Sequence, residues 1–152
     1  MTKILMVCLG NICRSPLAHG ILDSKLDASL FYVDSAGTAN YHVGNPPDPR
    51  SIAIANTYGI DISKQKSRQF TVKDFDTFDY IYAMDASNYE DIIRLSRHEE
   101  DRNKVQLILD LDCTLSNKNV PDPYYSGITG FENVYHLLEE VCVKLSQKLI
   151  SK

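Results

Sequence analysis

The feature that most constrains the fold is the segment at residues 4–16, where an apolar run meets a polar loop and then an amphipathic stretch. The run ILMV at residues 4–7 predicts a buried strand, and the stretch after residue 15 predicts a helix. Cys8 therefore lies where a strand ends and a loop leads into a helix N-terminus. Free N–H groups and the positive end of the helix dipole bind anions at such a place. The segment predicts an anion-binding loop in an α/β fold.

The same loop contains a candidate nucleophile. A helix N-terminus favours the thiolate form of a cysteine such as Cys8. Arg14 provides a planar guanidinium suited to two oxygens of a phosphate. Gly10 and Asn11 tolerate the left-handed backbone angles of a tight anion-binding loop, and Ser15 can donate a hydrogen bond to the cysteine sulfur. An ATP-binding loop is excluded because the Gly-Lys-Ser/Thr ending is missing. The residues predicted to form the phosphate-binding loop are Leu9, Gly10, Asn11, Ile12, Cys13 and Ser15.

Composition limits the class of protein. A length of 152 residues predicts one domain over residues 1–152, and 43% hydrophobic content is ordinary for a soluble globular protein. A net charge of -4 argues against nucleic-acid binding. No stretch is long and apolar enough for a bilayer, and residues 1–15 lack a signal-peptide pattern. The four cysteines have no zinc-like spacing and no histidine cluster beside them, so no zinc site is expected. Without an export signal we expect reduced thiols in a cytoplasm.

Strand and helix patterns alternate along the chain, which predicts a parallel four-stranded sheet with helices on both faces. In such sheets ligands bind beyond the carboxyl ends of the strands. Strands are predicted at residues 3–8, 30–34, 80–84 and 105–109, and helices at 15–27, 50–58, 86–95 and 130–150, with a capping box at 71–74 that begins a short helix.

A second polar group follows the fourth predicted strand, in the sequence VPDPYY at residues 120–125. Two prolines stiffen the loop around Asp122 and hold its carboxylate in place. The loop should project from the same sheet edge as Cys8, where a carboxylic acid could protonate a leaving oxygen. Taken alone, the loop is better explained as a proline-rich turn with a solvated aspartate. The pairing with the cysteine loop favours the catalytic interpretation.

Together these two motifs resemble the low-molecular-weight protein tyrosine phosphatase family. The similarity covers nearly the whole chain and implies a three-layer α/β/α fold, flavodoxin-like or phosphotyrosine phosphatase I-like, with strand order 2-1-3-4. It implies a cytoplasmic, metal-independent hydrolase that uses no organic cofactor. The motifs are CLGNICRSP at 8–16, DSAGT at 34–38, GNPPD at 44–48, FDYI at 78–81, MDASN at 84–88 and DPYY at 122–125.

The resemblance also implies roles for particular residues. Cys8 would be the nucleophile, Arg14 would bind the phosphoryl group, and Asp122 would be the general acid and then the base. Asn11 and Ser35 would brace the loop, and Ser15 would stabilise the thiolate. The substrate would be a phosphotyrosine protein, such as a bacterial tyrosine kinase, and the product inorganic phosphate. The protein itself would bind no nucleic acid and no membrane, and would be a monomer or a weak dimer. The pocket wall would be formed by Tyr41, Tyr124 and Tyr125.

This chain departs from the family at two places. Tyr41 stands where many relatives have tryptophan. The histidine that animal members carry in the stretch corresponding to residues 63–66 is absent, so another group, with Ser35 as a candidate, must hold Asn11.

Cys13 is a candidate redox partner of Cys8, with a packing role as the alternative. The scattered histidines are interpreted as surface or helix residues without a catalytic role: His19, His42, His98 and His136.

Two other functions fit parts of the pattern. An arsenate reductase of the same fold has a comparable loop, but it needs two further cysteines close together, whereas Cys113 and Cys142 lie far apart in the sequence. A non-catalytic phosphotyrosine-binding module is the second alternative. The presence of Cys8, Arg14 and Asp122 favours phosphate ester cleavage over both.

Overall fold

The apolar run at residues 4–7 forms the middle of strand β1 (Thr2–Cys8), the second of four parallel strands. A computed structural model describes residues 1–152. Strand β1 lies between β2 (Phe31–Gly37) and β3 (Tyr80–Ala83), and β4 (Val105–Leu107) pairs with β3. The strand order β2-β1-β3-β4 confirms the predicted order 2-1-3-4. Because both faces of β1 are covered, this strand has a continuous apolar run instead of an alternating pattern.

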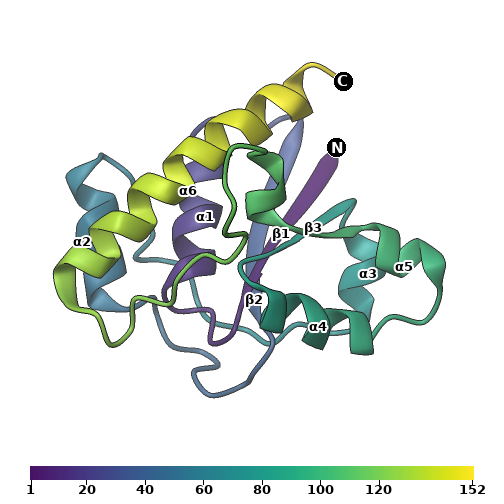
Figure 1. The fold of residues 1–152 in the computed structure, drawn as a ribbon, viewed down its shortest axis with the longest axis horizontal. Helices are drawn as coiled ribbons and strands as arrows, with labels where there is room; N and C mark the ends of the chain where they lie inside the picture. The colour runs from purple at the N-terminus through teal and green to yellow at the C-terminus, as the bar shows by residue number, and fades with distance from the viewer.

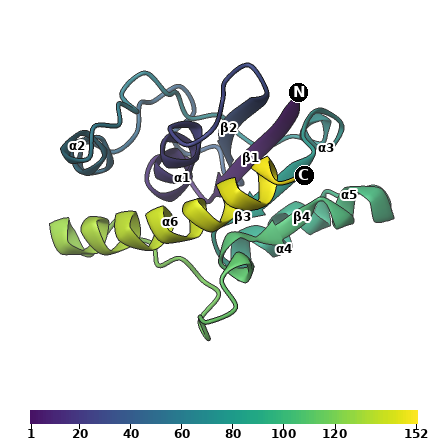
Figure 2. The same cartoon turned by 90° about the horizontal axis from the view of Figure 1, so that it is seen from above.

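Helices cover the sheet on both sides and complete the predicted three-layer α/β/α arrangement (Figures 1 and 2). Three of them pack on one face and two on the other, while α5 lies beside β4. The first group is α1 (Arg14–Asp23), α2 (Pro49–Thr57) and α6 (Gly127–Ile150), the second is α3 (Lys73–Thr77) and α4 (Ala86–Arg94), and α5 spans Glu99–Asn103.

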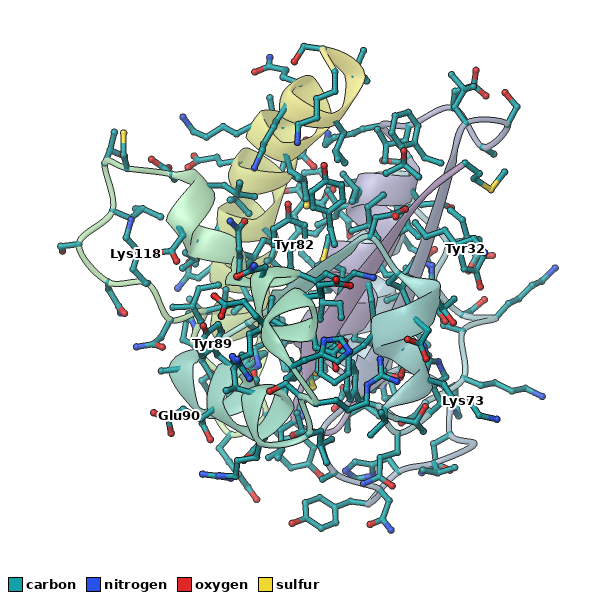
Figure 3. All side chains as sticks on the ribbon, turned by 90° about the vertical axis from the view of Figure 1, so that its right-hand side faces the viewer. Tyr32, Lys73, Tyr82, Tyr89, Glu90 and Lys118 are labelled. Carbon is teal, nitrogen blue, oxygen red and sulfur yellow. The ribbon has the colours of Figure 1, made fainter.

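Each face of the sheet has its own apolar cluster. The larger cluster joins strand residues such as Ile4 and Met6 to α1, α2 and α6. The smaller one joins Leu5 and Val7 to α3 and α4. Tyr82 of β3, labelled in Figure 3, is buried in the larger cluster. No helix combines the length and apolar character that crossing a membrane requires.

The parallel strands bring several loops together at one edge of the sheet. Cys8 ends β1 directly opposite Gly37, the last residue of β2, and Val7 pairs with Ala83 at the end of β3. A Cβ atom on Gly37 would lie 2.7 Å from the carbonyl oxygen of Leu9. Only a glycine therefore lets the end of β2 approach the cysteine loop this closely.

Several element boundaries differ from the sequence-based prediction. The fourth strand ends at Leu107, and the predicted strand residues Ile108 and Leu109 instead begin a 3₁₀ helix η1 (Ile108–Leu111). A short apolar run fits a buried strand or a buried helical turn equally well. The first helix was predicted to end at residue 27 but ends at Asp23. At this end the Ser24 hydroxyl donates to the Ile21 carbonyl oxygen at 2.6 Å. Helix α5 was not predicted.

Candidate active site

The loop between β1 and α1 turns its carbonyl groups outward. The carbonyl oxygen of Cys8 accepts from Thr38 N, that of Leu9 accepts from Ala39 N, and that of Ile12 accepts from Asp48 N, at 2.9, 2.9 and 2.7 Å. These bonds tie the loop to the segment that follows β2. With its acceptors occupied on the outside, the loop directs its N–H groups toward its own centre.

The N–H groups of Gly10, Ile12 and Cys13 donate to no protein atom. They precede the N-terminus of α1, where the first helical N–H groups also lack intrahelical partners and the helix dipole is positive. The Asn11 N–H points at the Cys8 sulfur, 3.3 Å away. The loop therefore forms a concave set of donors that fits a tetrahedral oxyanion next to that sulfur.

Side chains beneath the loop hold it in this shape. Asn11 has a left-handed backbone, with φ 57°, which is uncommon outside glycine. Its Nδ2 donates to Ser15 Oγ at 2.8 Å and to Ser35 Oγ at 3.0 Å. Its Oδ1 accepts from Arg68 N at 3.1 Å. Ser15 Oγ lies 3.0 Å from the sulfur of Cys8, to which it can donate because the Asn11 amide occupies it as an acceptor.

Hydrogen bonds to residues outside the cysteine loop fix the side chain of Arg14. Its Nη1 donates to Asp85 Oδ2 at 2.6 Å and to the Val120 carbonyl oxygen at 3.0 Å, and only 3% of its side chain is exposed. Burial opposes the positive charge, but the Cys8 sulfur and the neighbouring carboxylates outweigh it and raise the pKa of the guanidinium. The arginine thus remains charged and rigidly placed beside the cysteine.

Asp122 reaches the same place from the loop before α6. Its Oδ2 lies 3.7 Å from Arg14 Nη2, and its Oδ1 accepts from Tyr124 N at 3.1 Å. The loop is attached to the end of β3, since Val120 N donates to the Met84 carbonyl oxygen at 2.8 Å. The carboxylate is about half exposed, so it can exchange protons with solvent.

Cys8, Arg14 and Asp122 line a single open cavity of about 360 Å³. The three tyrosines predicted as its wall line it as well, and Tyr125 is 95% exposed. Asn11, Ser15 and Ser35 do not line the cavity and instead lie under the loop. The remaining lining residues are Leu9, Gly10, Ile12, Cys13 and His42.

Gly10 differs from the prediction. Its φ is not positive, so left-handed freedom does not explain the glycine. A Cβ atom at this position would instead lie 3.1 Å from Cδ2 of His42. The glycine leaves room for this histidine against the cavity wall, a contact between separate loops that the sequence pattern does not indicate.

Sequence reasoning assigned no individual role to several residues of the site. Asp85 lies in the MDASN motif, and its position directly after β3 was the available signal. Arg68 braces Asn11 through its backbone N–H, which no side-chain pattern can reveal. His19, on α1, has its Nδ1 3.2 Å from Ser35 Oγ.

The other cysteines have distinct surroundings. Burial, with Asp48 as the next contribution, raises the pKa of the Cys13 thiol to about 12. Burial likewise raises the pKa of Cys142 to about 12, while Cys113 is exposed and outside the cavity. No group of three or more histidine, cysteine or acidic side chains is placed to hold a metal ion.

Fold and site together define an α/β protein with a cysteine-containing oxyanion loop at the carboxyl edge of its parallel sheet. Residues 3–152 match the family model described as low molecular weight phosphotyrosine protein phosphatase. The chain is 42% identical over 143 residues to the low molecular weight phosphotyrosine protein phosphatase of Schizosaccharomyces pombe, covering 89% of this chain and 90% of the relative.

Solved structures agree with this match. A protein tyrosine phosphatase from Entamoeba histolytica, with Hepes in its active site, superposes with a TM-score of 0.91 at 37% identity, covering 99% of this chain and 98% of the other. Wzb of Vibrio vulnificus in complex with benzylphosphonate gives a TM-score of 0.86 at 30% identity, with 97% and 98% covered. The chain belongs to the low molecular weight phosphotyrosine protein phosphatase family and is a protein tyrosine phosphatase of the hydrolase class.

Proposed function

We propose that the enzyme hydrolyses phosphotyrosine in two displacement steps through a phosphocysteine on Cys8. The thiolate attacks phosphorus in line, a sulfur–phosphorus bond forms, and the bond to the phenolic oxygen breaks while Asp122 gives that oxygen its proton. The carboxylate of Asp122 then takes a proton from water, whose oxygen attacks phosphorus. Inorganic phosphate leaves and the thiolate returns.

Arg14 and the loop N–H groups would bind the equatorial oxygens of the phosphoryl group, where negative charge accumulates in both steps. The observation that carries the proposal is the meeting of Cys8, Arg14 and Asp122 around one cavity, although they come from loops far apart in the sequence. Hydrogen bonds from Ser15 and from the Asn11 N–H favour negative charge on the sulfur.

The aromatic wall supports a phosphotyrosine substrate. A phenyl phosphate can extend past Tyr41 and Tyr124 to the sulfur, whereas a phosphoserine side chain is shorter and has no ring to stack there. The benzylphosphonate bound to Wzb has the same combination of an aromatic ring and a tetrahedral oxyanion. We propose phosphotyrosine proteins as substrates, a bacterial tyrosine kinase being one candidate, and expect weak or no turnover of phosphoserine peptides.

The proposal also concerns state and location. A thiolate nucleophile has to be reduced, and all four cysteines are free, which supports a reducing compartment such as the cytoplasm. The exposed Tyr125 would allow at most weak self-association beside a monomeric state.

The test is hydrolysis of p-nitrophenyl phosphate in the presence of a metal chelator. We expect turnover by the wild type, none by Cys8→Ser, and normal turnover by Cys113→Ser, since Cys113 is exposed and lies outside the cavity. Inorganic phosphate should still bind to Cys8→Ser. Near-normal activity of Cys8→Ser would refute the mechanism, and phosphotyrosine binding without turnover by the wild type would indicate a binding module.

A further inference from the structure

His19 lies on α1 beneath the cysteine loop and takes no part in the mechanism proposed above. Its Nδ1 is 3.2 Å from the Oγ of Ser35, on the neighbouring strand β2. Ser35 in turn contacts the side-chain amide of Asn11 at 3.0 Å. The three side chains connect α1 and β2 to the middle of the phosphate-binding loop.

The direction of these hydrogen bonds is set at the far end of the chain of contacts. The backbone N–H of Arg68 can only donate, so the atom of Asn11 facing it must be the carbonyl Oδ1. The other end of the amide is therefore Nδ2, whose two hydrogens go to Ser15 Oγ and Ser35 Oγ. Ser35 is an acceptor toward Asn11, and its own hydrogen remains to be donated.

That hydrogen has one side-chain acceptor within reach. Ser35 is only 5% exposed, and apart from the Asn11 amide its Oγ contacts Nδ1 of His19 alone. The Ser35 hydroxyl donates there only if Nδ1 has a free lone pair, which puts the proton of the neutral ring on Nε2. A protonated ring would face the hydroxyl with a second donor and leave the Ser35 hydrogen unpaired in a buried place.

We propose that His19 is a positioning residue for the phosphate-binding loop: its neutral ring accepts the Ser35 hydroxyl at Nδ1 and so keeps Ser35 as the acceptor that holds Asn11. This inference rests on the proposed function in that the loop so held is the one that binds the phosphoryl group. It concerns a residue outside the cavity, which acts only through Ser35 and Asn11.

The surroundings of His19 agree with a neutral ring. Burial lowers the pKa of His19, while Asp34 and Asp23 act in the opposite direction. His19 lines a second cavity, separate from the one at Cys8, and besides these two aspartates the charged groups that line it are Asp61 and Lys64, from the segment after α2.

Asn11 needs this support because its backbone is left-handed and its N–H must point at the Cys8 sulfur. The side-chain amide of Asn11 is planar, so its two N–H hydrogens turn together. If Ser35 stops accepting one of them, rotation of the amide also breaks the hydrogen bond to Ser15. Both the donor set for phosphate and the hydroxyl that faces the sulfur would then lose their fixed geometry.

Two variants of nearly equal size test the proposal. In His19→Asn the side-chain oxygen can take the place of Nδ1 as an acceptor, whereas His19→Leu removes the acceptor. Leucine is the better helix former, so a loss confined to the leucine variant cannot come from a weaker α1. For p-nitrophenyl phosphate we expect kcat/KM to fall about tenfold in His19→Leu, with weaker inhibition by inorganic phosphate, and to stay within about threefold of wild type in His19→Asn. Equal activity of the two variants would overturn the proposal.

A second measurement needs no variant. The ¹⁵N–¹H spectrum of the wild-type His19 ring at pH 7 should show a proton on Nε2 and a bare Nδ1, and a proton on Nδ1 would overturn the proposal even if neither variant folds. The two failures are distinct: absence of wild-type turnover refutes the phosphatase mechanism, whereas the ring tautomer and the ratio of the two variants judge His19 alone.

Discussion

Asn11 is the only non-glycine residue with a positive φ, and it is placed where its strain can be offset. A left-handed residue costs of order 1 kcal/mol, and each net hydrogen bond returns a similar amount. Three side-chain hydrogen bonds hold Asn11, so the bent backbone that aims the loop N–H groups inward is the stable one. The loop thus owes its shape to contacts within the protein, and this preorganisation would lower the cost of binding the proposed phosphoryl group.

The role proposed for Asp122, proton donor to the leaving oxygen, predicts that the effect of replacing it depends on the leaving group. In Asp122→Asn the side-chain oxygen still accepts from Tyr124 N, so the loop keeps its geometry while the proton donor is lost. We expect kcat/KM to fall about 10²–10⁴-fold for phenyl phosphate, whose phenolate leaves poorly, and much less for 2,4-dinitrophenyl phosphate. Steady-state assays of both esters provide the measurement.

The control for this series is Asp110→Asn, because Asp110 is exposed on η1 and lies outside the cavity. It should behave as the wild type with both esters. An equal loss across leaving groups in Asp122→Asn would show that Asp122 acts on the loop or on binding and not as the acid.

Cys13 gives a second prediction at this scale. Its raised pKa, about 12, keeps it a thiol at neutral pH, so the thiolate proposed at Cys8 is the group that attacks peroxide. The O–O bond breaks, one oxygen stays on the Cys8 sulfur as a sulfenic acid, and the other leaves as water. The Cys13 thiol can then displace the sulfenic oxygen as water and close a disulfide, which a dithiol reopens. After peroxide inactivation we expect most activity to return in the wild type and in Cys113→Ala, and far less in Cys13→Ala. Equal recovery in all three would leave Cys13 with a packing role.

Sequence alone could place the chemical groups but not the contacts between them. The loops of Cys8 and Asp122 follow predicted strands, so the sequence predicts that they meet at one edge of the sheet, and the guanidinium of Arg14 marks the first loop as a phosphate site. The partner of Arg14, Asp85, follows a different strand, and nothing in the spacing says which carboxylate the arginine meets. The bracing of Asn11 by the Arg68 backbone depends on a loop path that no residue pattern encodes.

At the scale of elements, helix α2 connects stability to the site. Its N-cap Asp48 accepts from Arg50 N at 2.9 Å and pairs with the Arg50 guanidinium, while its own N–H holds the Ile12 carbonyl oxygen. The cap therefore fixes the helix and one side of the cysteine loop together.

Asp48→Ala should lower the free energy of unfolding by about 1–2 kcal/mol at pH 7, as measured by urea denaturation. The hydrogen bond from the Arg50 side chain depresses the pKa of Asp48 below its usual 3.8. Because the pKa of Asp48 is lower in the folded state, its carboxylate stabilises the fold fully above about pH 4, and this stabilisation is lost as the pH falls through the folded-state pKa. The gap between wild type and variant should thus narrow toward pH 3.

Glu90→Ala is the matched control for Asp48→Ala, since Glu90 is exposed on α4. It should leave the unfolding free energy within about 0.5 kcal/mol of wild type. A gap that stays constant from pH 7 to pH 3 in Asp48→Ala would exclude the charged cap as the cause.

Sequence patterns predicted the existence of the long elements better than their ends. The run at residues 105–109 is apolar except for Gln106, and only its tertiary surroundings decide that the strand stops at Leu107 and that the chain continues as a 3₁₀ helix. Helix α5 has four charged residues and no apolar stripe, so periodicity could not indicate it.

At the scale of the whole molecule, strand β1 belongs to both apolar clusters. Ile4 and Met6 point into the cluster under α1, α2 and α6, whereas Leu5 and Val7 point into the one under α3 and α4. Successive side chains of a strand face opposite sides of the sheet, so neither cluster can come apart without exposing β1 to water. We infer that residues 1–152 form a single cooperative domain.

This inference predicts one unfolding transition in urea. The chain has nine tyrosines and no tryptophan, so tyrosine fluorescence can follow packing while far-UV circular dichroism follows the helices. The two midpoints should coincide. Leu5→Ala and Met6→Ala each remove a fully buried side chain from a different cluster and should destabilise by about 2–5 kcal/mol, moving both probes together. If Leu5→Ala shifted one probe and left the other in place, the two faces of the sheet would unfold separately and the chain would not be one cooperative unit.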